Sequence, residues 1–178
     1  MASPQILDAC VLINLLASDE TDGILRAAAR ESFICSAVET ESIYLRTDDS
    51  SAPIERIDLR PLIDARLLTV CGIEGDEESE RYVDYASVLS DGEAMSLAIA
   101  LSRDYVLVTD EKKARRLFLE AAGKPTLLAS TSALIRNWAD DSISVERLKQ
   151  ALSKVERRAR YQPPPTDENH RWWLDASH

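Results

Sequence analysis

Short apolar runs alternate with segments of helical periodicity along most of the chain. The runs at residues 5–7, 33–35, 68–71, 105–109 and 126–129 have the length and composition of strands that are buried on both faces. Between them, apolar residues recur at intervals of three and four, which is typical of amphipathic helices. Because strands and helices alternate, we predict an α/β fold with a Rossmann-like parallel sheet that carries helices on both faces.

The clearest helix follows Gly92, where Ala94, Leu97, Ala98 and Leu101 share one face. Gly123 has the position of a helix C-terminus and ends a second helix that begins at residue 112. Helical periodicity is also found in residues 11–16, 24–30, 36–45, 59–67, 74–89, 131–138 and 144–160.

Residues 144–178 extend beyond the alternating pattern. A helix is predicted over 144–160, and the following tail holds the prolines 163–165 and the adjacent Trp172 and Trp173. Three consecutive prolines disfavour a helix, and paired tryptophans disfavour full exposure. We therefore predict an α/β domain at 1–143 and an extension at 144–178, whose tail docks on a second copy of the chain or on a partner.

Composition limits the chemistry that the core can carry. The 178 residues are 45% apolar, which is enough for one compact domain. The three cysteines are far apart among apolar residues, and the two histidines lie in the tail, so a disulfide framework or a histidine-based site is not expected. Without a long apolar segment or an export signal, we expect a soluble cytoplasmic protein with no membrane contact. Catalysis would have to rest on carboxylates.

The net charge of −10 is unevenly distributed. Residues 1–102 hold 7 Lys and Arg against 20 Asp and Glu, whereas residues 103–178 hold 14 against 11. An acidic protein repels a polyanion at long range, so a nucleic acid would have to bind to a local basic face.

Acidic residues occupy equivalent places after the predicted strands. Asp8 ends the first strand, Glu41 lies in the helix after the second, Asp91 and Glu93 open the helix at Gly92, and Asp110 ends the strand at 105–109. In a parallel sheet such positions meet at the carboxyl edge, and a cluster of acids is stabilised there by a divalent cation. The expected ion is Mg²⁺ or Mn²⁺, and the expected chemistry is hydrolysis of a phosphodiester.

Each acid also has a purely structural interpretation. Ser90 and Glu93 have the spacing of a capping box, and Asp8 and Asp110 could cap the helices that follow them. Glu41 could be a surface residue, and the nearby Glu39 competes for its role. The joint placement of the acids favours a metal site over these alternatives.

A basic cluster directly follows Asp110. A solvated helix face is one interpretation, but the cluster adjoins the acids, and we predict that it contacts the phosphates of a nucleic-acid substrate. Its members are Lys112, Lys113, Arg115 and Arg116.

Four motifs in this order resemble those of PIN-domain ribonucleases, the family that includes the VapC-like toxins of bacterial toxin/antitoxin pairs. The motifs are ILDACVLINLL, SAVETESIYL, LSDGEAMSLAIAL and LVTDEKKARRL, which together span roughly residues 5–140. The V-x-x-E spacing selects Glu41 over Glu39. The resemblance implies that the metal-binding acids are Asp8, Glu41, Glu93 and Asp110, with Asp91 as a fifth.

The resemblance also implies an activity and partners. A PIN ribonuclease would use Mg²⁺ or Mn²⁺ to cut RNA, would form a homodimer and would bind an inhibitory antitoxin. The competing hypothesis is an inactive PIN-like module that binds a protein partner through its C-terminal extension. A phosphatase with an aspartyl nucleophile is disfavoured, because no second aspartate follows two residues after Asp8.

Overall fold

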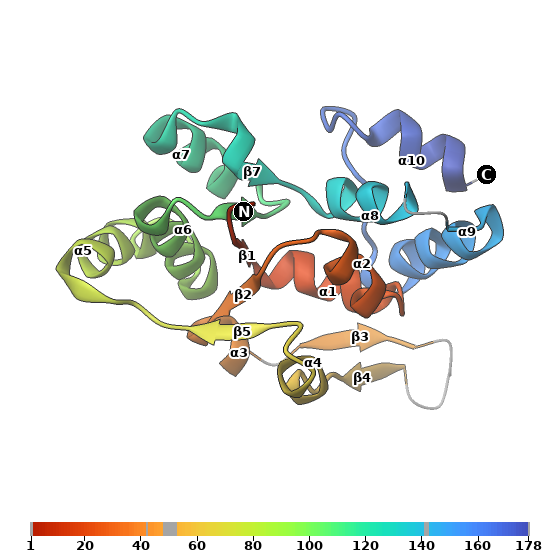
Figure 1. The fold of residues 1–178 in the computed structure, drawn as a ribbon, viewed down its shortest axis with the longest axis horizontal. Helices are drawn as coiled ribbons and strands as arrows, with labels where there is room; N and C mark the ends of the chain where they lie inside the picture. Colours follow the sequence, from red (N-terminus) through yellow and green to blue (C-terminus); the bar gives the residue numbers. More distant parts are fainter. Residues whose placement is uncertain (1, 42, 48–52, 141–142, 178) are drawn as a thin grey trace. The chain divides into compact units, whose positions relative to one another are not determined.

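The computed structural model describes residues 2–41, 43–47, 53–140 and 143–177 (Figure 1). The chain forms two compact units, each assembled from segments that are distant in sequence. The first unit consists of Met1–Val11, Arg30–Glu41 and Leu59–Ser130. The second consists of Leu12–Ala29, Ser42–Asp58 and Thr131–His178.

A five-stranded parallel sheet forms the centre of the first unit. In spatial order its strands are β5 Thr69–Cys71, β2 Ser32–Cys35, β1 Gln5–Leu7, β6 Val106–Val108 and β7 Leu128–Ala129. The central strand β1 pairs in parallel with both β2 and β6, and all of its residues are buried. The prediction of an α/β fold with a parallel sheet is confirmed.

Helices flank this sheet (Figure 1). The longest, α6, packs on strands β1, β2 and β6 through buried residues such as Leu97 and Ala98, as the periodicity predicted. Helix α5 packs against α6, and α7 ends at Gly123, whose φ of +60° suits glycine. The helices are α3 Ser36–Thr40, α4 Arg60–Asp64, α5 Gly75–Ala86, α6 Asp91–Arg103, α7 Lys112–Ala122 and the 3₁₀ turn η1 Pro125–Leu127.

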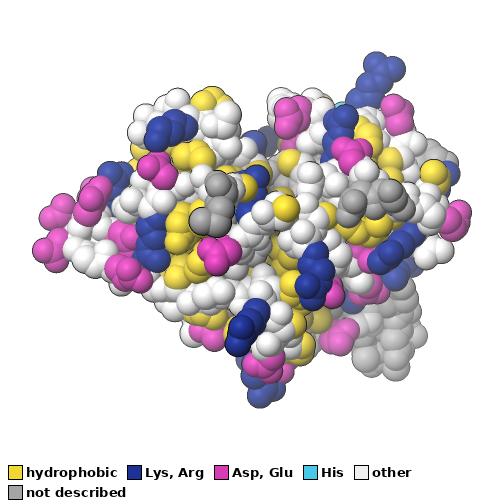
Figure 2. All heavy atoms as spheres, in the orientation of Figure 1, with side chains coloured by type: hydrophobic (Ala, Val, Ile, Leu, Met, Phe, Trp, Pro, Cys, Tyr) yellow, Lys and Arg dark blue, Asp and Glu magenta, His cyan; other side chains and the backbone are white. Residues whose placement is uncertain are grey.

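Acidic side chains gather over α5 on the surface (Figure 2). Glu78 differs from the acids Asp76 and Glu77 in the same first turn of α5, because it is buried and pairs with Arg103 at 2.7 Å between Oε1 and Nε. The hydrogen bonds from Arg103 hold the pKa of Glu78 below its ordinary value. Glu78 therefore ties α5 to the end of α6.

The second unit combines helices with a short ribbon. The ribbon pairs β3 Tyr44–Arg46 with β4 Ile54–Arg56 in antiparallel fashion. Helix α1 begins in the first unit and ends in the second. The helical elements are α1 Ala9–Ala17, α2 Thr21–Ala27, α8 Thr131–Ala139, α9 Val145–Lys154, the π-helical turn η2 Val155–Ala159 and α10 His170–Ser177.

The helix predicted over 36–45 is wrong beyond Thr40. Glu41 already has an extended backbone, with φ −63° and ψ 139°, and Tyr44–Arg46 forms β3. Leu45 is buried while its neighbours Tyr44 and Arg46 are exposed, which is the alternation of a strand. Residues 48–52 lie outside the described residues, and Ile54–Arg56 forms β4.

The tail packs on its own chain, which corrects the expectation that it docks elsewhere. Trp173 is fully buried, and its Nε1 donates to Glu156 Oε1 at 2.8 Å. Tyr161 contacts the Trp173 ring edge-on, with centroids 5.6 Å apart. The sequence 170–177 forms a helix after the prolines, so only the segment around 163–165 follows the predicted non-helical course.

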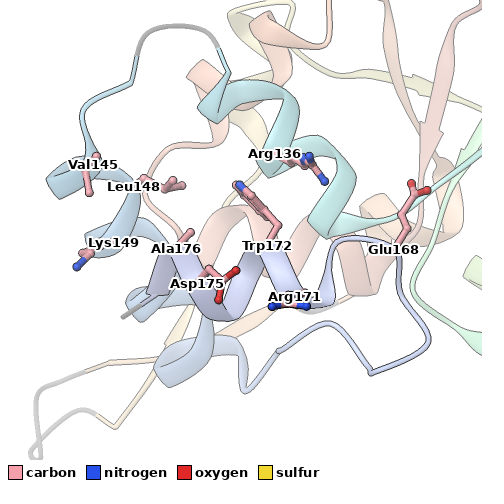
Figure 3. A pocket seen from close by; sticks show the side chains of 9 residues that line it. All are labelled: Arg136, Val145, Leu148, Lys149, Glu168, Arg171, Trp172, Asp175 and Ala176. Carbon is pink, nitrogen blue, oxygen red and sulfur yellow. The ribbon is translucent and has the colours of Figure 1, made fainter.

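Of the two adjacent tryptophans, Trp172 is the one that reaches the surface. It lies in an open pocket of about 620 Å³ together with Val145 and Leu148 of α9 and Ala176 of α10 (Figure 3). The Arg136 guanidinium lies 5.7 Å from the centroid of the Trp172 ring. This pocket belongs entirely to the second unit.

Candidate functional site

The first unit brings Asp8 and Asp110 to the same edge of the sheet. Strands β1 and β6 are parallel neighbours in which Leu7 pairs with Val108, and the two acids follow these strands directly. The Asp8 N–H donates to the Val108 carbonyl at 3.0 Å, which continues the pairing beyond Leu7. Both acids therefore lie at the carboxyl ends of their strands, where sites of open α/β sheets form.

Asp8 is held in one orientation by three donors. Its Oδ1 accepts from the Ala9 N–H at 2.7 Å, and its Oδ2 accepts from Thr109 Oγ1 at 2.8 Å and from Cys10 Sγ at 3.3 Å. The side chain is 2% exposed. Burial raises the pKa of Asp8 above its ordinary value of 3.8, and the charge of Glu93 adds to this, although the three hydrogen bonds act in the opposite direction.

Thr109 and Cys10 were not among the predicted site residues. The fully buried Thr109 donates to Asp8 and accepts from the Glu111 N–H at 3.2 Å, so its hydroxyl joins the first acid to the turn that carries Asp110. The thiol of Cys10 accepts a hydrogen bond from the Asp110 backbone, and burial with the charge of Asp8 raises its pKa far above its ordinary value. Cys10 is thus a neutral donor to Asp8. All three cysteines are free, as expected.

The N-terminus of α6 contributes Asp91 and Glu93. Ser90 caps this helix, and the capping box is complete: Glu93 N–H donates to Ser90 Oγ at 3.5 Å, and Ser90 N–H donates to Glu93 Oε2 at 2.9 Å. The capping box that was predicted from the spacing of Ser90 and Glu93 is therefore confirmed. Asp91 is exposed and accepts from Tyr82 Oη at 3.3 Å.

Glu41 reaches this helix N-terminus from the end of α3. A Cβ atom built on Gly92 would lie 2.6 Å from Glu41 Oε1 and 3.1 Å from Val38 Cγ2. Only a residue without a side chain allows this approach. Gly92 was predicted merely as a helix start, but it also makes room for the second acid.

The acids influence one another electrostatically. Partial burial raises the pKa of Glu41, and the charges of Asp8, Glu93 and Asp91 raise it further. Across the described part of the chain, no lysine or arginine forms an ion pair with Asp8, Glu41 or Glu93. Within the described residues, the negative charges of Asp8, Glu41 and Glu93 are therefore not offset by an ion pair.

The donor chemistry of this site fits a hard divalent cation, because each ligand candidate offers carboxylate oxygens. The described residues include no group of three or more His, Cys, Asp or Glu that is already arranged to hold an ion. Asp8 is turned toward Thr109, and Glu93 is turned toward Ser90. The fit thus rests on the chemistry and mutual influence of the acids and not on a finished coordination shell.

The predicted basic cluster has specific contacts inside the first unit. Arg115 Nη1 donates to the carbonyls of Thr109 and Ala129, each at 2.8 Å, and so joins the ends of β6 and β7. Lys113 Nζ donates to the Val88 carbonyl at 2.6 Å, and Arg116 lies 3.7 Å from Glu120. The RNA contact of Lys112, Lys113, Arg115 and Arg116 stays a prediction, and Arg115 has a structural role that the sequence did not indicate.

A parallel sheet with acids beyond its strand ends defines an α/β domain with an acidic site at its carboxyl edge. The model of one family, DUF3368, described as a PIN domain, matches residues 4–123, about two thirds of the chain. The chain therefore belongs to the PIN-domain family, and the predicted family is confirmed. PIN domains are generally nucleases, and they typically use divalent metals.

No curated protein and no solved structure matches the chain. In the parts of the chain that the structure describes, no helix combines the length and apolar character needed to cross a membrane. The family match ends at residue 123, so the boundary predicted at residue 143 stays a prediction.

Proposed function

We propose that this protein is a metal-dependent endoribonuclease that hydrolyses phosphodiester bonds in RNA. The observation that carries the proposal is the placement of Asp8 and Asp110 at the ends of neighbouring parallel strands, with Glu41 against the start of α6. Burial raises the pKa of Asp8 and of Glu41, and the charges of nearby acids raise both further, while among the described residues neither Asp8 nor Glu41 forms an ion pair with an arginine or lysine. In a member of a nuclease family, such a group is best explained as the ligand set of a cation.

Asp8, Glu41, Glu93 and Asp110 would hold Mg²⁺ or Mn²⁺, with Asp91 as a further ligand. When bound, the cation would activate water for attack and neutralise the charge that develops on the phosphate. Thr109 and the Ala9 N–H fix the Asp8 carboxylate, so this ligand would be positioned before any substrate arrives. Gly92 leaves room for the Glu41 carboxylate at the N-terminus of α6.

The test is a cleavage assay with the purified full-length chain. End-labelled single-stranded RNA, structured RNA and DNA of the same sequence are incubated with Mg²⁺, with Mn²⁺ or with EDTA. We expect RNA to be cut internally with either ion and to stay intact with EDTA. Asp110→Asn protein that is purified by the same procedure controls for a contaminating nuclease, because it should not cut RNA. Intact RNA under every condition would reject the proposal in favour of the inactive interaction module.

The toxin role belongs to the same proposal. We infer a cytoplasmic homodimer that is inhibited by an antitoxin encoded beside it. Expression of the wild-type chain in bacteria should arrest growth, and Asp110→Asn should not. Co-expression of the small neighbouring reading frame should relieve the arrest and yield a complex on affinity purification. Unimpaired growth with abundant soluble wild-type protein would remove the toxin role and leave the nuclease.

A further inference from the structure

The β3–β4 ribbon presents one face that consists of two arginines, a tyrosine and an isoleucine. In the antiparallel register, Tyr44 lies opposite Arg56 and Arg46 lies opposite Ile54, so these four side chains point to the same side. All four are exposed, and Tyr44 and Ile54 are 52% and 61% exposed. The face therefore combines two apolar side chains with two cations.

The opposite side of the ribbon is anchored in the second unit. Leu45 is 1% exposed and Ile43 is 2% exposed. The Ile57 N–H donates to the Ile43 carbonyl at 2.9 Å, and Arg158 Nε donates to the Arg46 carbonyl at 3.2 Å. Because these contacts involve the backbone and the buried side, substitutions of the outward side chains should leave the ribbon folded.

The outward face is positively charged. Among the described residues, neither Arg46 nor Arg56 forms an ion pair. The one acid of the paired strands, Glu55, lies opposite Leu45 and therefore points to the other side. This local charge contrasts with the net charge of −10 for the whole chain.

We propose that this face binds single-stranded RNA, an inference that rests on the proposed nuclease function. Arg46 and Arg56 would contact phosphates, and Tyr44 would stack with a base. Two-stranded ribbons are used for nucleic-acid recognition elsewhere. A protein strand would add to the edge of the ribbon and would not need cations on its face, so the charge favours RNA.

Binding is measured by fluorescence anisotropy with the full-length chain and a fluorescein-labelled oligouridylate in EDTA, which prevents cleavage. For Arg46→Gln/Arg56→Gln, the slope of log Kd against log salt should fall by about 1.4, since each phosphate contact on a single strand contributes about 0.7. Arg26→Gln/Arg171→Gln removes two exposed arginines of the same unit and should leave the slope unchanged.

Tyr44 provides a second measurement. Tyr44→Leu keeps an apolar side chain but removes the aromatic face, so the Kd should rise by about tenfold. Tyr44→Phe retains the ring and should bind like the wild type. Circular dichroism of each variant verifies that the fold is retained, because only the outward side chains change.

The outcomes separate this proposal from the nuclease proposal. A wild-type chain that binds RNA through the ribbon but cuts none refutes the nuclease and supports the ribbon. A chain that cuts RNA while its ribbon variants keep the wild-type Kd and salt slope overturns the ribbon, and strand addition by a protein then becomes the interpretation to test. Absence of RNA binding by the wild type at about 50 mM salt also overturns it.

Discussion

The Glu41 carboxylate lies against Gly92, so closely that a Cβ at position 92 would lie 2.6 Å from Glu41 Oε1. This contact joins the end of α3 to the first turn of α6. Gly92, the smallest residue of this turn, therefore determines where the Glu41 carboxylate can lie.

Gly92→Ala should therefore separate stability from activity. Alanine is favoured over glycine in a helix by about 1 kcal/mol, and the clash with the end of the Glu41 side chain can be relieved by rotation of that side chain. We expect a melting temperature within a few degrees of the wild type, about the shift that 1 kcal/mol produces. Cleavage and stabilisation by Mn²⁺ should both fall strongly. Gly72→Ala, which would meet no atom within 4 Å, is the control. If Mn²⁺ stabilises Gly92→Ala as much as the wild type, Gly92 does not position Glu41 as a metal ligand.

Asp110→Asn should abolish cleavage with little loss of stability. The amide retains the shape of the side chain but removes the charge that would hold the ion. Outer-shell partners of a metal typically contribute 10- to 100-fold, so loss of a ligand should lower the cleavage rate by at least about 100-fold. Calorimetry with and without Mn²⁺ should show stabilisation of the wild type and much less of the variant. Cleavage at the wild-type rate would exclude Asp110 from the metal site.

Glu41→Gln should change how stability depends on pH. The pKa of Glu41 is raised in the folded protein above its ordinary value of 4.5, so the folded state binds its proton more tightly than the unfolded state. This contribution is fully present below pH 4.5 and is lost as pH rises through the folded pKa. The variant should therefore be more stable than the wild type at neutral pH, and the difference should shrink toward pH 4.5. Denaturant unfolding across this range, without divalent cations, measures it; an advantage that is constant with pH would exclude the charge as its cause.

Arg115→Met should destabilise the fold. Arg115 joins the carbonyls of Thr109 and Ala129, and charged hydrogen bonds of this kind contribute about 1.5–3 kcal/mol. Urea unfolding should show a loss of this order, whereas Lys112→Met, on the exposed start of the same helix, should be nearly neutral. If Arg115→Met keeps wild-type stability and loses only RNA affinity, Arg115 belongs to the RNA-binding surface.

The sheet was predictable because strands that are covered on both faces have unbroken apolar sequences, as at Val106–Val108. The ribbon was not, since β4 is exposed at every position and carries no alternation of apolar and polar residues. Helix α10 was missed because its buried face within eight residues rests largely on Trp173, directly after a proline-rich stretch. Short elements whose stability comes from tertiary contacts leave little periodicity in the sequence.

The candidate acids could be identified from their positions after the strands, but their surroundings could not. Thr109 donates to Asp8 across 101 residues of sequence, and Gly92 approaches Glu41 across another long separation. Such contacts depend on strand order, which periodicity does not specify. Glu93 shows the converse, since its capping box is local and was recognised directly from the spacing to Ser90.

The order of strands also determines when the acidic site can first exist during synthesis. Strand β1 is among the first segments to be made, but its neighbour β6 and the hydroxyl that orients Asp8 follow 101 residues later. At about 5–20 residues per second, a ribosome needs roughly 5–20 s to cover that distance. Throughout this interval the nascent chain has Asp8 without Thr109 and without the edge that holds Asp110. A chain that stops before residue 109 would thus lack the assembled site, so premature termination yields a fragment without the proposed catalytic centre.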